Sequence, residues 1–392
     1  MSRIVLLFAV LHTIGASAQI SVLYPGDVGI ATDPRVLFTE QFESDLSTIT
    51  GSYDDVLNPA GMSVDSDVPA GSAGAQSIRL TNIGGQNNGG HLYKRFTPGW
   101  DSTIYLRYYV RYPSSSQGYI HHESIWLGGY NPSIPWPYPR AGECGLGDAR
   151  ISIAYEPVAN GMNTYMYWGG MRNDPNGDCW GNVMLVGDSV ARPVPFDEWL
   201  CVEMMVKLNH PDTAHNGELR IWHNGDEVGH WGQGFPTGHW LWDKFHITAG
   251  EPGFEGFQWR TDEALNLNYV WIEYYDDTSP NGVSHHILYD HLVIATERIG
   301  PLEPALGLRP GTAGASIELR GPDLDGGLTL RLPPEWDNAD ILIFDAYGHT
   351  LLHQRMHGAE ERLDVSVFAP GIYACQVLHV GHRARALFAK AH

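Results

Sequence analysis

The stretch that decides the fold begins with Tyr105-Leu-Arg-Tyr-Tyr-Val-Arg111 and continues with His121-His-Glu-Ser-Ile-Trp-Leu-Gly-Gly129. Two shorter pieces follow, Asp148-Ala-Arg150 and Tyr165-Met-Tyr167. Side chains on a β-strand point alternately to the two faces of a sheet. Residues 105, 107, 109 and 111 therefore share a face, as do 148 and 150 on a second strand and 165 and 167 on a third. The pattern predicts strands that gather arginine, histidine and tyrosine on one sheet face.

Strand patterns continue after this stretch, and no long amphipathic helix interrupts them. The clearest are residues 200–208, the hairpin 218–231 with Asn224-Gly225 at its turn, and residues 269–275 and 286–294. Asn-Gly accepts the positive φ of a tight hairpin turn. We therefore expect an all-β protein with two domains. Residues 19–300 should form a concanavalin-like β-jelly-roll sandwich, residues 301–314 a Pro/Gly/Ala-rich linker, and residues 315–392 a small Ig-like β-sandwich.

The charge of the chain limits its partners. Its 392 residues include 24 Lys/Arg and 45 Asp/Glu, which gives a formal net charge of −21. Such a balance argues against a nucleic-acid partner. Between residues 91 and 172, however, seven Lys/Arg stand against five acids, and three histidines lie there too. The local field can therefore differ in sign from the global one, so an anionic partner can still bind there.

The first residues resemble an export signal. Residues 1–18 combine Arg3, an apolar run and a small-residue cleavage site at Ala16-Ser-Ala18, as a secretory signal peptide does. The apolar run is too short to span a bilayer, and no later stretch approaches the required length. We therefore expect an exported protein without a membrane span.

The cysteines and acidic clusters do not predict a metal site. Export permits a disulfide between Cys144 and Cys179, although spacing alone leaves the connectivity open. Cys201 lies in a strand and is interpreted as a buried thiol, while Cys375 belongs to the second domain. No Cys/His spacing matches structural zinc. Asp276-Asp277 is interpreted as an acidic turn rather than a calcium site. We expect no cofactor.

The closing residues resemble the carboxy-terminal sorting domain of the type IX secretion system. The resemblance rests on Asp345 and Gly348, Leu363-Asp-Val-Ser366, Pro370-Gly-Ile-Tyr373 and the basic end at Lys390, although no Pro-Asn-Pro opens the domain. It implies a secretion address without chemistry of its own, with the type IX machinery as partner. It also implies a secreted or cell-surface protein, exported through the periplasm of a Gram-negative bacterium. The alternative is an ordinary β-sandwich accessory module.

The larger domain resembles alginate and glucuronan lyases of polysaccharide lyase family fourteen, which are β-jelly rolls. Residues 106–111 resemble the family's early strand, residues 122–129 its Lys-Leu-Pro-Gly-Leu-x-Gly-Gly segment, and Tyr165-Met-Tyr167 its Tyr-x-Tyr. Arg150 matches the arginine of the family's Ser-x-Arg. Two positions depart from the pattern: the catalytic lysine is His122 here, and the serine is Asp148. These departures leave the fold expectation intact and put the activity in question.

The resemblance implies β-elimination on a uronic-acid polymer, so the expected partner is an acidic polysaccharide. Arg150 would neutralise the carboxylate of the substrate. Tyr165 and Tyr167 would move protons if nearby cations lower their pKa, and His122 would replace the lysine. The candidate substrate-binding residues are Arg107, Arg111, His121, Trp126, Tyr130, Asp148 and Trp168.

Other functions fit the same residues. A non-catalytic, lectin-like binding module would use the tryptophans and tyrosines to stack on sugar rings and would need no proton transfer. A glycoside hydrolase generally needs two carboxylates that flank the scissile bond, and no Glu-x-Asp-x-Glu strand is present. A purely structural exported protein is the remaining alternative.

Overall fold

A computed structural model describes residues 19–144, 147–158, 161–187, 191–303, 318–322, 326–332, 336, 338–345, 350–356, 358–379 and 382–390. The chain divides into two compact units, of which the first ends at residue 306. Both units consist mainly of strands, so the expected all-β fold is confirmed. The predicted signal peptide, Gly348 and most of the predicted linker lie outside the described residues.

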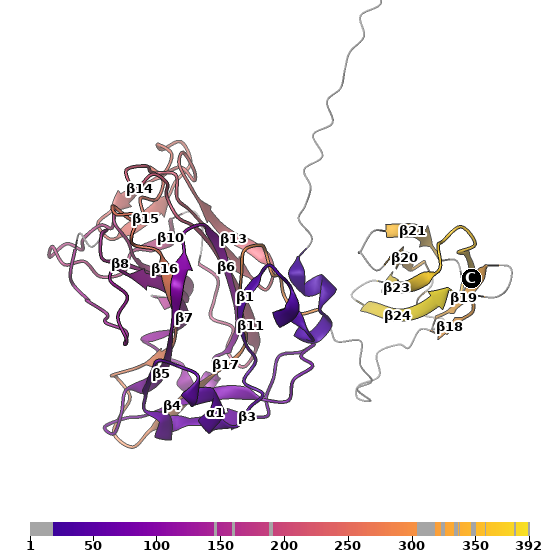
Figure 1. The fold of residues 1–392 in the computed structure, drawn as a ribbon, viewed down its shortest axis with the longest axis horizontal. Helices are drawn as coiled ribbons and strands as arrows, with labels where there is room; N and C mark the ends of the chain where they lie inside the picture. The colour runs from indigo at the N-terminus through magenta and orange to yellow at the C-terminus, as the bar shows by residue number, and fades with distance from the viewer. Residues whose placement is uncertain are drawn as a thin grey trace, which may run out of the picture. The chain divides into compact units, whose positions relative to one another are not determined.

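Two large antiparallel sheets form the first unit (Figure 1). The eight-stranded sheet runs in the order β13 (Asp226–Trp231), β12 (Glu218–His223), β11 (Trp199–Lys207), β6 (Thr103–Arg111), β17 (Ser284–Ala295), β4 (Ser77–Ile83) and β3 (Met62–Asp65), with β1 (Val36–Glu40) also paired to β17. The six-stranded sheet runs β2 (Asp55–Leu57), β5 (Gly89–Trp100), β16 (Leu267–Tyr275), β7 (His122–Tyr130), β8 (Arg150–Val158) and β9 (Gly161–Tyr167). A small sheet contains β10 (Val183–Gly187), β15 (Lys244–Ile247) and β14 (Gly238–Leu241).

The core lies between the two large sheets, and strand alternation determines which residues enter it. Leu106, Tyr108 and Val110 of β6 and Ile125 and Leu127 of β7 belong to one buried cluster. The same alternation sends the residues between them to the outer faces of the sheets. The outer face of the six-stranded sheet therefore receives the polar residues of β7, β8, β9 and β16.

Helices play a small part. The α-helix α1 (Leu46–Gly51) is capped by Asp45, whose Oδ1 accepts hydrogen bonds from the backbone of Ser47 and Thr48 at 3.1 Å. The short 3₁₀ turns are η1 (Ile20–Leu23), η2 (Pro25–Asp27), η3 (Ile30–Thr32), η4 (Pro59–Gly61) and η5 (Ser114–Ser116). In Figure 1, α1, β3 and β4 lie at one end of the first unit, and β14 and β15 at the other. Each helix of the described residues is too short or too polar to cross a bilayer.

A buried polar network fastens the N-terminal segment to the outer face of the eight-stranded sheet. His291 of β17 contacts Asp27 through Nδ1 and Ser72 through Nε2, both at 2.8 Å. The serine–histidine–aspartate order matches that of a hydrolase triad. However, Arg107 pairs with the same oxygen of Asp27, and all of these side chains are buried. The network therefore serves to anchor η2 to β6 and β17.

The second unit contains two small sheets. One holds β18 (Glu318–Arg320), β19 (Gly327–Arg331) and β22 (Glu360–Asp364), and the other holds β21 (Thr350–Arg355), β20 (Asp340–Phe344), β23 (Gly371–His379) and β24 (His382–Lys390). Leu330, Ile341, Ile343 and Val377 belong to their shared core. Lys390 ends the last strand, and its Nζ donates to the carbonyls of Val365 and Phe368 at 2.9 and 2.6 Å. The basic end noted in the sequence therefore closes this small sandwich.

Candidate active site

The outer face of the six-stranded sheet carries a cavity of about 360 Å³. Its residues come from β7, β8, β9 and β16 and from the loops beyond them. The lining residues are His121, His122, Trp126, Pro139, Ala141, Arg150, Tyr165, Tyr167, Trp180, Trp271, Glu273 and Tyr275. The four residues predicted to be catalytic, His122, Arg150, Tyr165 and Tyr167, thus line one cavity although they come from three strands.

Aromatic rings form the floor of this cavity. The rings of Trp126 and Trp271, on neighbouring strands, stack with centroids 5.8 Å apart at 27°. Tyr165 meets Trp126 edge-on at 6.0 Å. Flat apolar surfaces of this kind suit the faces of sugar rings. Both tryptophans are almost fully buried, so they offer a surface to a ligand only through the cavity.

His122 is held by a buried carboxylate. Its Nδ1 lies 2.8 Å from Oε1 of Glu156, which projects from β8 and is fully buried. Since a carboxylate only accepts hydrogen bonds, the proton sits on Nδ1 and leaves Nε2 without one in the neutral ring. Burial alone would lower the pKa of His122, but the charge and hydrogen bond of Glu156 outweigh it and raise that pKa above its ordinary value.

Arg150 is a buried cation on the same face. Its side chain is 1% exposed, its Nε donates to Ser152 at 3.0 Å, and its guanidinium lies 3.9 Å from the ring centre of Tyr167. Among the described residues, no carboxylate lies within ion-pairing distance, and Nη1 is buried without a hydrogen-bond partner. Buried charges are normally paired. An unpaired guanidinium that lines a cavity is therefore suited to bind an anion.

The tyrosines stay protonated. The hydroxyl groups of Tyr165 and Tyr167 lie 3.5 Å apart, and the ring of Tyr165 lies 4.8 Å from that of His122. Burial raises the pKa of both phenols above the ordinary tyrosine value. The predicted role in proton transfer, as base or as acid, assumed that nearby cations lower the pKa of these tyrosines, and burial shifts it in the opposite direction. At neutral pH both residues act as hydrogen-bond donors.

Two carboxylates of the site were missed in the sequence. Glu156 lies six residues after Arg150 on β8, and Glu273 lies two residues after Trp271 on β16. Both spacings are even, so alternation alone places them on the face of the candidate residues. Burial raises the pKa of Glu273 to about 8, and the charge of His122 opposes this effect. Each is the one acid of its strand, a signal that was available in the sequence.

A disulfide joins two loops at the rim of the cavity. Cys144 and Cys179 are bonded, as expected, while Cys201 and Cys375 are free and buried. The pair links the loop that carries Pro139 and Ala141 to the loop that carries Trp180. Two backbone hydrogen bonds between Gly142 and Cys179, at 3.1 and 3.2 Å, reinforce the link.

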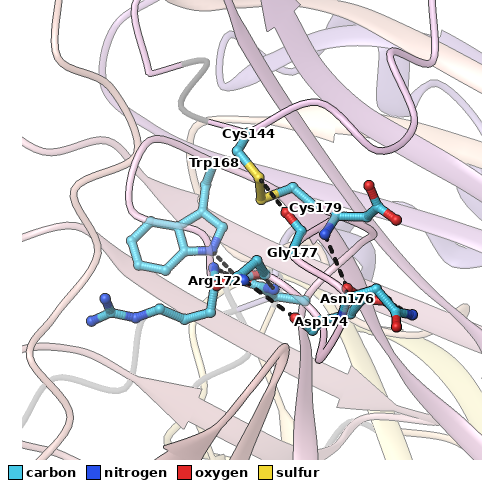
Figure 2. Close-up of a disulfide and its surroundings, with 10 residues drawn as sticks. Cys144, Trp168, Arg172, Asp174, Asn176, Gly177 and Cys179 are labelled. Atoms are coloured by element: carbon cyan, nitrogen blue, oxygen red, sulfur yellow. Dashed lines mark hydrogen bonds between the residues drawn. A yellow bond between two sulfur atoms is a disulfide. The ribbon is translucent and has the colours of Figure 1, made fainter.

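The loop around the disulfide has an ordered base (Figure 2). Oδ1 of Asp174 accepts hydrogen bonds from the backbone of Asn176 and Asp178 at 2.8 and 3.0 Å. Oδ1 of Asn182 accepts hydrogen bonds from the indole N–H of Trp168 at 3.0 Å and from the backbone N–H of Arg172 at 2.9 Å. Hydrogen bonds therefore fix the chain both before Trp180, at residues 174–178, and after it, at Asn182.

The structure corrects the expected position of several substrate-binding candidates. Trp168 is 1% exposed and packs in the core, because it has the opposite parity to Tyr167. Arg107 and Arg111 lie on β6, in the eight-stranded sheet, where Arg107 pairs with Asp27 and Arg111 with Asp67. None of the three lines the cavity.

The remaining candidates divide between the cavity and its surroundings. His121 lines the cavity and stacks on His122 with ring centres 4.5 Å apart. Tyr130 is buried outside the cavity, where its hydroxyl donates to the carbonyl of Tyr138 at 2.6 Å and so supports the rim loop. Asp148 is exposed in the turn before β8 and does not line the cavity.

The described residues contain no group of three or more His, Cys, Asp or Glu arranged to hold a metal ion. Asp276 is occupied in its own turn, where Oδ1 accepts from the backbone of Thr278 at 2.9 Å.

Comparisons with known proteins give similarity at the level of structure alone. No protein-family model matches the chain, and no curated protein matches it. An alginate lyase from Chlorella virus is 12% identical, with a TM-score of 0.44, over 66% of this chain and 99% of that one. The alginate lyase Aly36B, a mutant in complex with alginate tetrasaccharide, is 14% identical with a TM-score of 0.41, over 68% and 96%. The binding domain of botulinum neurotoxin serotype C1 is 9% identical with a TM-score of 0.32, over 86% and 69%.

Proposed function

We propose that this protein cleaves a uronic-acid-containing polysaccharide by β-elimination. The observation that carries the proposal is Arg150, a buried cation without a carboxylate partner among the described residues, in one cavity with His122. A uronate brings the carboxylate that such a cation lacks. The aromatic floor supplies the flat surface that a sugar ring needs.

The reaction makes three demands on the site. The proton on C5, next to the carboxylate, must leave, the bond between C4 and its oxygen must break, and the charge that develops on the carboxylate must be stabilised. Arg150 holds the carboxylate through parallel hydrogen bonds, because its guanidinium is planar and always charged. This contact makes the C5 proton more acidic.

His122 is the base in this proposal. Glu156 fixes the proton on Nδ1, so Nε2 is left to accept the proton of C5. A histidine whose pKa lies above its ordinary value is, in its neutral form, a stronger base than an ordinary histidine. Tyr165 and Tyr167 keep their protons and donate hydrogen bonds to the sugar.

The test is to mix the protein with glucuronan, alginate and related polymers and to record the ultraviolet absorbance of the unsaturated product. Absorbance that grows with time on at least one polymer supports elimination. New reducing ends without this absorbance would instead indicate hydrolysis, with Glu156 and Glu273 as the two carboxylates. The same experiment with the His122→Ala variant gives the absorbance change that does not depend on His122.

A second candidate function is carbohydrate binding without catalysis. The observation that favours it is the exposure of Trp136, Tyr138 and Trp180, at 56%, 51% and 42%. Trp180 lines the cavity, and Trp136 and Tyr138 shortly precede the lining residue Pro139 in the chain. Exposed aromatic rings beside a cavity are typical of sugar-binding surfaces. A binding module would hold the polymer with unchanged affinity after His122→Ala and would release no product.

We propose in addition that the second unit directs export through the type IX secretion system. Its support is the sequence resemblance together with the docking of Lys390 onto the turn at residues 365–368. The test is to truncate the chain after residue 306 in a Gram-negative host that has this system. Retention of the truncated protein in the periplasm supports the proposal, and unchanged export contradicts it.

A further inference from the structure

Glu273 is a carboxylate that lines the cavity without an ion-pair partner among the described residues. It projects from β16 between Trp271 and Tyr275, opposite Ser124 of β7 and His91 of β5 in the strand register. Glu273 lines the cavity together with His122 and Arg150. It belongs to no ion pair of the described residues, in contrast to Glu156, which contacts His122.

The groups around Glu273 determine its charge. His122 faces it from β7, Glu156 and Arg150 from β8, and the two stacked tryptophans lie beside it. Tyr165 and Tyr167 of β9 line the same cavity and stay protonated. His91 of β5 lies opposite Glu273 in the strand register, and Asp277 contacts His121 at 3.3 Å. Burial raises the pKa of Glu273 to about 8 and Glu156 adds to this, while His122 and Arg150 act in the opposite direction. Most Glu273 side chains therefore carry a proton at neutral pH.

We propose that Glu273 is the general acid that protonates the glycosidic oxygen as it leaves C4, an assignment that rests on the proposed lyase function. In this step Nε2 of His122 takes the proton of C5, and the electrons of that bond form the double bond between C4 and C5. The C4–oxygen bond breaks, and the oxygen takes the proton of Glu273. The products are an unsaturated uronate and a chain end with a hydroxyl group, and a proton returns from His122 to Glu273 through water.

A protonated Glu273 avoids repulsion between two negative charges when a uronate binds. A second ionised carboxylate beside Arg150 would repel the uronate and compete with it for the guanidinium. A protonated Glu273 does neither, and it donates a proton where a bare carboxylate cannot. It also suits the task better than Tyr165 or Tyr167, because an acid whose pKa lies near the working pH transfers its proton more readily.

The experiment compares two substrates in the full-length protein. Glu273→Gln keeps the shape of the side chain and removes its acidic proton, so polymer cleavage should fall by about 10²–10⁴-fold. A small uronate that carries 4-nitrophenol on C4 has a leaving group that needs no proton, so on it the variant should retain activity within a few-fold of the parent protein. Glu273→Asp should recover part of the polymer activity. Glu251→Gln, an exposed carboxylate outside the cavity, is the matched control and should change neither rate.

The outcomes separate this assignment from the proposed function. If Glu273→Gln cleaves the polymer at the parent rate, Glu273 is not the acid and the lyase function stands. The same holds if the variant loses activity on both substrates to the same extent while it still binds the polymer. If the parent protein forms no unsaturated product from any uronate polymer or from the small uronate, the lyase function fails and the assignment fails with it.

Discussion

Nδ1 of His122 lies 2.8 Å from Oε1 of Glu156, and this contact orients a histidine ring that packs against both Trp126 of the aromatic floor and Tyr165. The ring is thereby fixed in one tautomer, and its charged form is stabilised by a buried carboxylate. In the proposed mechanism, the pair sets the pH range in which His122 can accept a proton and leaves Nε2 to accept it.

The first prediction concerns Glu156→Gln. The substitution removes the negative charge that raises the pKa of His122, so the acidic limb of the pH–rate profile should move to lower pH. The rate should fall at least about tenfold, since the ring loses its fixed tautomer. Initial rates measured from acid to alkaline pH check both effects. An unchanged acidic limb would show that His122 does not control the reaction.

The second prediction concerns Arg150→Lys. Lysine keeps the positive charge but loses the paired hydrogen bonds and the stacking on Tyr167. KM should rise tenfold to a hundredfold, in line with the ~1.5–3 kcal/mol typical of hydrogen bonds to charged groups. Arg192→Lys, an exposed arginine outside the cavity, is the control and should leave KM unchanged. Equal effects of the two substitutions would remove Arg150 from substrate binding.

The third prediction is a bell-shaped pH profile for the parent protein. The base must be unprotonated, so activity should rise as pH passes the pKa of His122, which lies above the ordinary histidine value of about 6.5. The acid must be protonated, so activity should fall as pH passes the pKa of Glu273, about 8. Measurement of kcat/KM across this range tests it. The alkaline limb should disappear in Glu273→Gln.

The fourth prediction concerns stability, through Asp27→Asn in the buried network of Arg107 and His291. Loss of one partner of a buried ion pair leaves Arg107 uncompensated, so the free energy of unfolding should fall by about 3–5 kcal/mol. Denaturant unfolding of the full chain measures this. Asp65→Asn, which breaks the partly exposed pair with Arg79, should lower it by less than about 1 kcal/mol.

The pH dependence of the same network has a definite sign. Burial alone would raise the pKa of Asp27, but Arg107 and His291 outweigh it and hold that pKa below the ordinary value. The pair therefore stabilises the fold above the unfolded pKa of about 3.9, and this contribution is lost as pH falls through the folded pKa. Asp27→Asn should remove that part of the acid sensitivity. Identical acid unfolding of both proteins would contradict it.

The sequence predicted which residues share a face of one strand better than it predicted which strands pair with each other. Alternation correctly grouped Tyr165 with Tyr167, because it depends only on local backbone geometry. The grouping of Asp148 with Arg150 was wrong, since β8 begins only at Arg150 and Asp148 lies in the turn before it. Alternation could not place Arg107, since the pairing of β6 with β11 and β17 joins segments far apart in the chain. The arginines of β6 therefore appeared to belong with Arg150 of β8.

The missed residues have a different cause. Glu156 and Glu273 are the single acids of two strands whose other residues are mostly apolar or aromatic. Nothing in the sequence says that two such strands lie on either side of β7, which brings both carboxylates close to His122. Trp168 was foreseeable, since alternation after Tyr167 already turns it toward the core.

The bond between Cys144 and Cys179 gives the cavity a dependence on its chemical surroundings. The floor is held by strand pairing and packing, which thiol chemistry does not touch, whereas the two rim loops share a covalent link that a reductant can open. In a reducing compartment the same chain would keep its proton-transfer groups and lose the fastening of its entrance. If the protein acts as proposed, reduction of this bond should weaken its hold on a long polymer more than its reaction with a small sugar.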